Sequence, residues 1–138
     1  PRENQDLECG VLMRSIEWLA GILEGEGHFR SNVSGSSGIY TNPAISIAMT
    51  DYDVMVEVEA VFEVVGGRHK NINKRALPSG KIAYILYLTG LPAAKVMYAV
   101  LPFMGERRSA RIKAILRAWH PIKYKGASAF KLGLEGVV

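Results

Sequence analysis

The stretch that decides the fold is Trp18-Leu19-Ala20-Gly21-Ile22-Leu23-Glu24-Gly25-Glu26-Gly27-His28-Phe29. Its apolar residues recur at the spacing of one helix face: Ile16, Leu19, Ala20 and Leu23. This spacing predicts a helix over residues 15–25 that ends in its glycines. Gly21 and Gly25 are four residues apart on one face, where small residues let a second helix approach closely. Because Glu26 follows at the end of the helix, two copies of it would bring two carboxylates together.

The residues that follow predict two strand pairs and three further helices. Strands are expected over residues 28–33 and 40–49, around a Ser/Gly loop, and a helix over 50–66 begins in a capping box of Thr50 and Asp53. A second hairpin joins strands over 68–75 and 81–89, with Ile82, Tyr84 and Leu86 on one covered face. Helices are expected over 91–102 and 106–120. This order predicts an α+β fold in which helices cover one face of an antiparallel four-stranded sheet and the other face is free for a ligand.

Length and composition predict one domain. The chain has 138 residues, 49% of them hydrophobic, which is the size of a single compact domain. We expect residues 1–138 to form it, with a core over about 13–120 and a basic C-terminal tail over 121–138. No apolar run is long enough to span a bilayer, and the acidic N-terminal segment lacks the order of a signal peptide. An intracellular protein without a membrane partner is expected. The single cysteine, Cys9, excludes a disulfide scaffold.

The net charge of +4 is unevenly distributed. Residues 50–66 hold five acids and no base, residues 67–81 hold five bases and no acid, and residues 105–125 hold seven bases and one acid. Such basic blocks are either solvated faces or the electrostatic footprint of a phosphate-bearing partner. Charge alone leaves both interpretations open.

The nine residues from Leu19 to Gly27 closely resemble the signature helix of the LAGLIDADG homing endonucleases, in the Glu-Gly-Glu-Gly variant of single-motif members. The order of the strand pairs and helices also matches, so the resemblance covers about residues 13–120. It implies an αββαββα fold and a homodimer that hydrolyses both strands of a long, pseudo-palindromic double-stranded DNA target. The dimer interface is then expected at Trp18, Gly21, Ile22 and Gly25.

Glu26 is the expected catalytic and metal-holding residue, with Gly25 beside it. A carboxylate there is a hard oxygen ligand suited to Mg²⁺, which keeps most of its waters and takes a substrate phosphate as a further ligand. Mn²⁺ or Ca²⁺ can substitute in binding. Glu24 is two residues away, hence on another face, and is expected to cap this helix or to bind a neighbour.

The resemblance also implies a basic residue just before the last helix and a polar residue just before the second helix, which support waters at the metal. Arg107 and Arg108 are the candidates for the first role. Thr50 or Asp51 stands where the family often has glutamine.

The free face of the sheet is expected over the DNA major groove. The residues expected to contact DNA are His28, Arg30, Asn32, Tyr40, Ser46, Arg68, His69, Asn71, Asn73, Arg75 and Lys81. In the strand over 68–75, the apolar Ile72 favours a covered side that includes Lys74 and an outward side that includes Arg75. A bulge at Gly66-Gly67 would reverse that assignment.

Two alternatives to the nuclease use the same scaffold: an RNA-binding maturase that assists intron splicing, and a non-catalytic DNA-binding regulator. Glu26 disfavours the regulator, because an unneeded carboxylate at a phosphate-rich interface would repel DNA.

Overall fold

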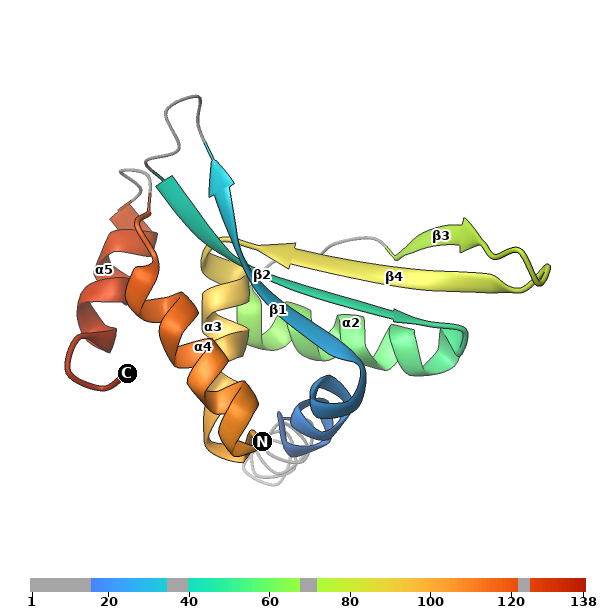
Figure 1. The fold of residues 1–138 in the computed structure, drawn as a ribbon, viewed down its shortest axis with the longest axis horizontal. Helices are drawn as coiled ribbons and strands as arrows, with labels where there is room; N and C mark the ends of the chain where they lie inside the picture. The colour runs from blue at the N-terminus through green and yellow to red at the C-terminus, as the bar shows by residue number, and fades with distance from the viewer. Residues whose placement is uncertain (1–15, 35–39, 68–71, 122–124) are drawn as a thin grey trace, which may run out of the picture.

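The computed structural model describes residues 16–34, 40–67, 72–121 and 125–138 (Figure 1). The helix over residues 16–26, called the motif helix below, leads into β1 (Gly27–Ser34) and β2 (Tyr40–Met49). The elements after β2 are α2 (Tyr52–Gly66), β3 (Asn73–Ala76), β4 (Ile82–Thr89), α3 (Leu91–Val100), the short 3₁₀ helix η1 (Leu101–Phe103), α4 (Glu106–Ala118) and α5 (Lys125–Leu134). The predicted α+β class is confirmed. None of the helices in these ranges is long and apolar enough to cross a membrane.

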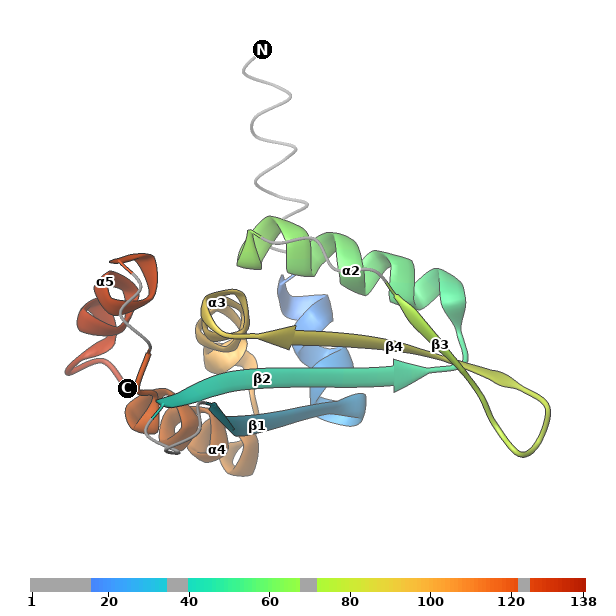
Figure 2. The same cartoon turned by 90° about the horizontal axis from the view of Figure 1, so that it is seen from above.

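The four strands form one antiparallel sheet in the order β1-β2-β4-β3. The strands β2 and β4 lie in the middle of the sheet, in agreement with the covered residues of β4. Figure 1 shows the helices gathered on one side of the sheet, and Figure 2 shows the same layers from above. The opposite side carries no described helix, and we call it the open face.

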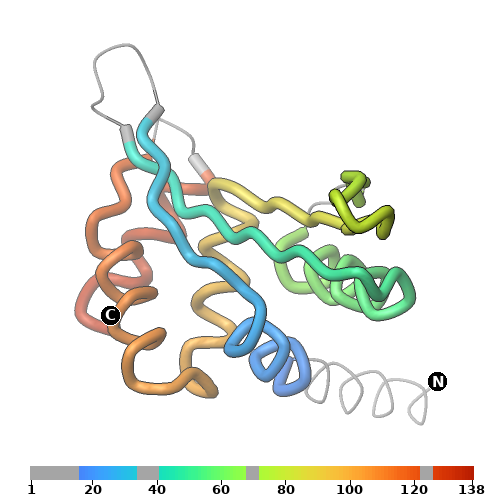
Figure 3. The backbone as a smooth tube through the Cα atoms, turned by 45° about the vertical axis from the view of Figure 1, so that its right-hand side comes forward, coloured from blue at the N-terminus to red at the C-terminus, as the bar shows by residue number. Residues whose placement is uncertain are grey.

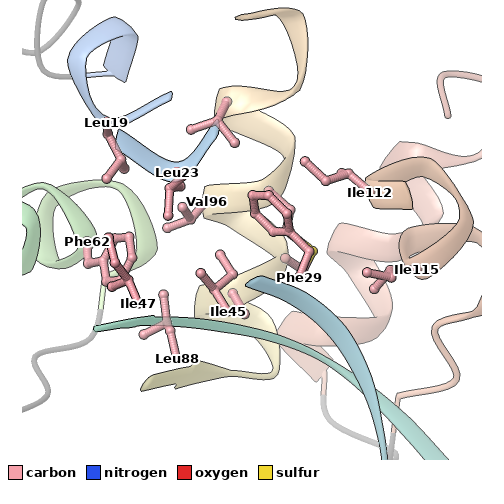
Figure 4. Close-up of a cluster of buried hydrophobic side chains, with 14 of the residues drawn as sticks. Leu19, Leu23, Phe29, Ile45, Ile47, Phe62, Leu88, Val96, Ile112 and Ile115 are labelled. Atoms are coloured by element: carbon pink, nitrogen blue, oxygen red, sulfur yellow. The ribbon is translucent and has the colours of Figure 1, made fainter. Parts of the chain in front are cut away.

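The core lies between the sheet and the helices. Along β2, Ile45 and Ile47 are buried on the helical side, and the alternating Ser46 and Ala48 are more exposed. The motif helix, α3 and α4 cover those isoleucines with side chains at helical spacing, including Leu19, Leu23, Val96, Ile112 and Ile115 (Figure 4). Burying such aliphatic side chains stabilises the fold by about 1.5–3 kcal/mol each. The motif helix is therefore held to the sheet by its apolar stripe.

The segment over 121–138 differs from the expected basic tail, because it contains α5. Ala127 and Leu134 are buried, and the ring of Phe130 lies 6.4 Å from that of Trp119 and 6.2 Å from that of Tyr98. These apolar residues recur in steps of three and four, which is a helical stripe that the lysines obscured. The core thus extends beyond residue 120.

The start of α2 also differs from expectation. Asp51, not Thr50, is the N-cap residue, and its side chain makes no capping hydrogen bond. The expected capping box of Thr50 and Asp53 is therefore wrong. A carboxylate that caps no helix is left for another role.

Some expected DNA contacts lie outside the described residues, namely Arg68, His69 and Asn71. Tyr40 begins β2 opposite Ser34, but its side chain lies outside what the structure describes. The turn at 77–80 is formed as expected, with hydrogen bonds from the Gly80 amide to the Leu77 carbonyl and from the Leu77 amide to the Lys81 carbonyl.

Candidate functional site

The register of the sheet places the polar residues of β1 on the open face. His28 lies opposite Ser46, and Ser46 lies in turn opposite Tyr87 of β4. Arg30 and Asn32 follow on the same side of β1, because alternate residues of a strand share a face. The open face is therefore lined by hydrogen-bonding groups, which is the chemistry that reads base edges and phosphates.

Tyr87 belongs to this polar surface, although sequence reasoning did not select it. Asn32 Nδ2 donates a hydrogen bond to the Tyr87 hydroxyl, and the Arg30 guanidinium lies 6.0 Å from the centre of the Tyr87 ring. Because residues alternate along β4, Tyr87 faces the other side of the sheet from its covered neighbours Leu86 and Leu88. That alternation was the signal that could have identified it.

The register also settles which side of β3 faces outward. Asn73 lies opposite Ile85 and Arg75 opposite Ala83, both on the open face, whereas Lys74 lies opposite Tyr84 on the helical side. The favoured face assignment is confirmed for these residues. Lys81 is exposed beside the turn before β4.

Glu26 stands where the motif helix runs directly into β1 (Figure 3). The backbone turns sharply there, and a Cβ at Gly27 would stand only 2.7 Å from Leu23 Cδ2 and 2.9 Å from the Leu23 carbonyl oxygen. Only glycine fits this junction. Glu26 is exposed at the edge of the open face, in a hollow whose other polar side chains are Thr50, Asp51 and Arg75.

This hollow gathers residues from four parts of the chain. Ala48 and Ala83 form part of its floor, with Met49 and Leu77 beside them. Thr50 and Asp51 come from the β2–α2 connection, where a polar residue was expected near Glu26. Two carboxylates and a hydroxyl line one open space.

Glu24 lies in different surroundings from Glu26. Its Oε2 accepts a hydrogen bond from the Gly105 amide (3.3 Å), at the N-terminus of α4, and lies 3.9 Å from Arg108 Nε. A carboxylate at a helix N-terminus is favoured by the unpaired amides and the helix dipole. A Cβ at Gly105 would stand 2.8 Å from Glu24 Oε1, so a larger residue there would shift the Glu24 carboxylate. Glu24 thus binds a neighbouring element, the start of α4, which was one of the two roles expected of it.

The basic side chains of α4 bind the chain's own backbone. Arg108 donates a hydrogen bond to the Gly27 carbonyl (2.6 Å), and Arg111 donates one to the Phe29 carbonyl (3.3 Å). Both carbonyls belong to β1, an edge strand of the sheet, so the two arginines tie α4 to this edge. Arg117 donates to the Val138 carbonyl (2.8 Å). Much of this basic block therefore has a structural role.

The two arginines proposed near the reaction do not line the hollow of Glu26. Neither Arg107 nor Arg108 is among the described residues that line the hollow. Arg108 is committed to Glu24 and Gly27, and Arg107 is exposed on the first turn of α4. Within one chain, the cation that shares the hollow with Glu26 is Arg75.

The donor set of the hollow fits Mg²⁺. This ion is held in proteins by one or two carboxylates, its own waters and substrate phosphates. Glu26 and Asp51 supply two carboxylates, and Gly25 is exposed beside them. In the described ranges no group of three or more His, Cys, Asp or Glu forms a metal cage. The residues present therefore suit an ion whose coordination the substrate completes.

The outer face of the motif helix agrees with a helix-to-helix contact. Trp18 and Ile22 are half-buried and Gly21 and Gly25 are exposed, whereas Leu23 is fully buried. A Cβ at Gly21 or Gly25 would meet nothing within 4 Å. Packing within the chain therefore does not require these two glycines.

Comparison with known proteins identifies the fold. No protein-family model matches the sequence, and no curated protein matches it. The homing endonuclease I-CvuI, solved with DNA targets in the presence of Mg or Ca, has a TM-score of 0.54 at 12% identity, over 77% of this chain and 66% of its own. The I-LtrWI LAGLIDADG homing endonuclease, bound to target DNA, has a TM-score of 0.55 at 14% identity, over 75% of this chain and 36% of its own. The chain thus spans about two thirds of the first relative and about a third of the second.

Proposed function

Because the chain has the fold of the LAGLIDADG homing endonucleases, we propose that it is a Mg²⁺-dependent, site-specific endonuclease that cuts both strands of a long, pseudo-palindromic DNA duplex as a homodimer. The observation that carries this proposal is the position of Glu26. It stands at the edge of an open, polar sheet face, in a hollow that Asp51 and Arg75 also line. A surface that only bound DNA would have no use for two carboxylates there.

The open face would hold the DNA. Arg30 and His28 are exposed there, and Asn32, Ser46 and Tyr87 are half-buried. Side chains of these types donate to phosphates and read base edges in the major groove. Because the sheet extends past the helices on the β3–β4 side (Figure 1), its polar face offers a long track for a duplex.

The chemistry would take place in the hollow. Glu26, with Asp51, would hold Mg²⁺, which when bound polarises a phosphate oxygen and activates water for attack on phosphorus. The Thr50 hydroxyl can hydrogen-bond a water and so orient it. In the hydrolysis the water oxygen forms a new bond to phosphorus and gives up a proton, while the bond from phosphorus to the leaving deoxyribose oxygen breaks and that oxygen takes up a proton. Glu26 would thus bind the ion, and the neighbouring polar groups would position the attacking water.

The dimer supplies the second cut. On the motif helix, a Cβ at Gly21 or Gly25 would meet nothing within 4 Å among the residues that the structure describes. Two such helices packed face to face would place two copies of Glu26 on either side of a twofold axis, one for each DNA strand.

Cleavage of a plasmid library in Mg²⁺, followed by sequencing of the cut junctions, tests this function. We expect double-strand breaks at one long, pseudo-palindromic sequence, and EDTA should abolish them. Specific DNA binding without cutting would favour the regulator instead, and tighter binding of an intron RNA than of any duplex would favour the maturase. Nicks in one strand only would contradict the homodimer.

A further inference from the structure

Arg75 shares the hollow with Glu26 although it comes from the opposite edge of the sheet. Glu26 precedes β1 and Arg75 lies on β3, with β2 and β4 between them. Neighbouring strands are about 4.8 Å apart, so the two backbones stand about 14 Å apart across three spacings. Both residues nevertheless line the same space. That space has room for groups that neither side chain provides.

The residues between them are small. The residues of the two central strands that line the hollow on the open face are alanines, Ala48 of β2 and Ala83 of β4. Ala83 lies directly opposite Arg75 and is only 6% exposed, although it faces outward. Neighbouring side chains therefore cover it.

The charges of the hollow need a cation. Glu26 and Asp51 carry two negative charges, and the Mg²⁺ proposed above balances them. A phosphodiester brings one more negative charge, which Arg75 would balance. Guanidinium suits this task, because its planar fork binds two phosphate oxygens at once and it stays charged.

The other arginines close to Glu26 in the fold have partners. Arg108 is hydrogen-bonded to Gly27 and paired with Glu24, and Arg111 is hydrogen-bonded to Phe29. Within the described part of the chain, Arg75 enters no ion pair. It is the arginine whose charge is left for a ligand of the hollow.

We propose that Arg75 is a catalytic residue that binds the scissile phosphate, opposite the ion held by Glu26, and stabilises the charge that grows on its oxygens as the water attacks. The inference rests on the nuclease function proposed above. It moves the catalytic cation from the start of α4 to β3. Arg75 is then more than an anchor for the DNA.

The test compares Arg75→Ala, Arg75→Lys and the control Lys74→Ala in single-turnover cleavage at saturating DNA. Loss of one preorganised electrostatic donor slows the chemical step by about 10²–10³-fold, which is the loss we expect for Arg75→Ala. The cleavage rate of Arg75→Lys should lie between those of Arg75→Ala and the parent, because lysine keeps the positive charge and loses the planar, two-pronged guanidinium. Lys74 is exposed on the same strand and on the opposite face, so its removal should leave the rate unchanged.

A binding measurement gives an independent readout. In DNA whose scissile phosphates, mapped from the cut junctions, are replaced by neutral methylphosphonates, the parent should lose affinity. Arg75→Ala should lose less affinity than the parent on this replacement, since its guanidinium contact is already absent and only the contact with the ion remains. These titrations use Ca²⁺ in place of Mg²⁺ so that the unmodified DNA stays intact.

The outcomes separate the two proposals. If the parent cuts and Arg75→Ala cuts at the parental rate once saturated, Arg75 is a DNA anchor and the inference is overturned, while the nuclease stands. A methylphosphonate effect of equal size in the parent and in Arg75→Ala also overturns it. If the parent itself fails to cut, the proposed function fails and takes the inference with it.

Discussion

Glu24 and Glu26 are two residues apart, and the structure gives them opposite surroundings. Residues two apart in a helix are separated by about 200° around its axis, so their side chains leave on different sides. Glu24 contacts the Gly105 amide and Arg108, where the motif helix meets the start of α4. Glu26 stands in the hollow of the open face. The difference teaches that acidity in a motif does not define a site: one carboxylate fixes the position of the helix end, and the other is presented by it.

Exchanging each carboxylate for an amide should separate the two roles most clearly. Glu26→Gln should slow cleavage by at least about 10²–10³-fold, since an amide cannot provide the negative charge that holds the ion. It should leave the free energy of unfolding within about 0.5 kcal/mol, because the side chain is exposed. Glu24→Gln should instead destabilise the fold by about 1 kcal/mol and slow cleavage far less. Single-turnover kinetics and urea denaturation measure both. Equal losses of rate would mean that the two carboxylates are not distinct.

Gly27→Ala would test the junction that places Glu26. The new methyl group would meet Leu23 at 2.7–3.0 Å, partly at its backbone, so the helix end or the strand must shift. Overpacking of this kind destabilises by about 1–3 kcal/mol. Gly133→Ala is the control, because it adds the same group to α5 with nothing within 4 Å and should stabilise by up to about 1 kcal/mol. Similar denaturation midpoints for the two variants would contradict the close approach.

Arg108→Met should weaken the contact between α4 and β1. It removes the donor to the Gly27 carbonyl and the partner of Glu24, while the methylene packing is largely kept. Loss of a hydrogen bond with a charged donor costs about 1–2 kcal/mol. The matched change, Arg107→Met, alters an exposed neighbour and should shift the free energy of unfolding by less than about 0.5 kcal/mol. If Arg107→Met lowered the free energy of unfolding more than Arg108→Met does, the roles assigned to these two arginines would be reversed.

Gly21→Ala should have the smallest effect within one chain and the opposite sign. A Cβ there meets nothing within 4 Å, so alanine should stabilise the helix by up to about 1 kcal/mol. In the proposed dimer the same methyl group would hold two helices apart. We therefore expect a more stable chain that associates more weakly, measured by thermal unfolding and sedimentation equilibrium. An unchanged association constant would place the dimer contact elsewhere.

Much of the fold was predictable, because local patterns carried it. The alternation over Tyr40–Met49 fixes β2 to the residue, and the stripe of Ile112, Ile115 and Leu116 identifies α4. The start of α2 was not predictable, because Thr50 and Asp51 are equally plausible N-cap residues. Which of them begins the helix depends on where the preceding strand ends. α5 was not predicted, because lysines lie among Ala127, Phe130 and Leu134 and make their helical spacing less evident.

The candidate site was predictable only where one segment carries it. Glu26 follows from the motif helix alone. That Glu26 and Arg75 line the same hollow depends on the strand order β1-β2-β4-β3 and on the pairing of Arg75 with Ala83. No local sequence pattern predicts either of these. Likewise, a run of bases before the last helix does not reveal that Arg108 and Arg111 satisfy the edge carbonyls of β1.

The central claim is that the ion is held at Glu26 and not at Glu24, and Fe²⁺-directed cutting of the protein backbone tests it most directly. Fe²⁺ that replaces Mg²⁺ in the complex with target DNA generates hydroxyl radicals at the site of the ion, and these cut the nearest backbone. We predict fragments that end near residues 26, 50–51 and 75, lost in Glu26→Gln and kept in Glu24→Gln. Fragments that end near residues 24 and 105, or cutting that persists in Glu26→Gln, would contradict the account.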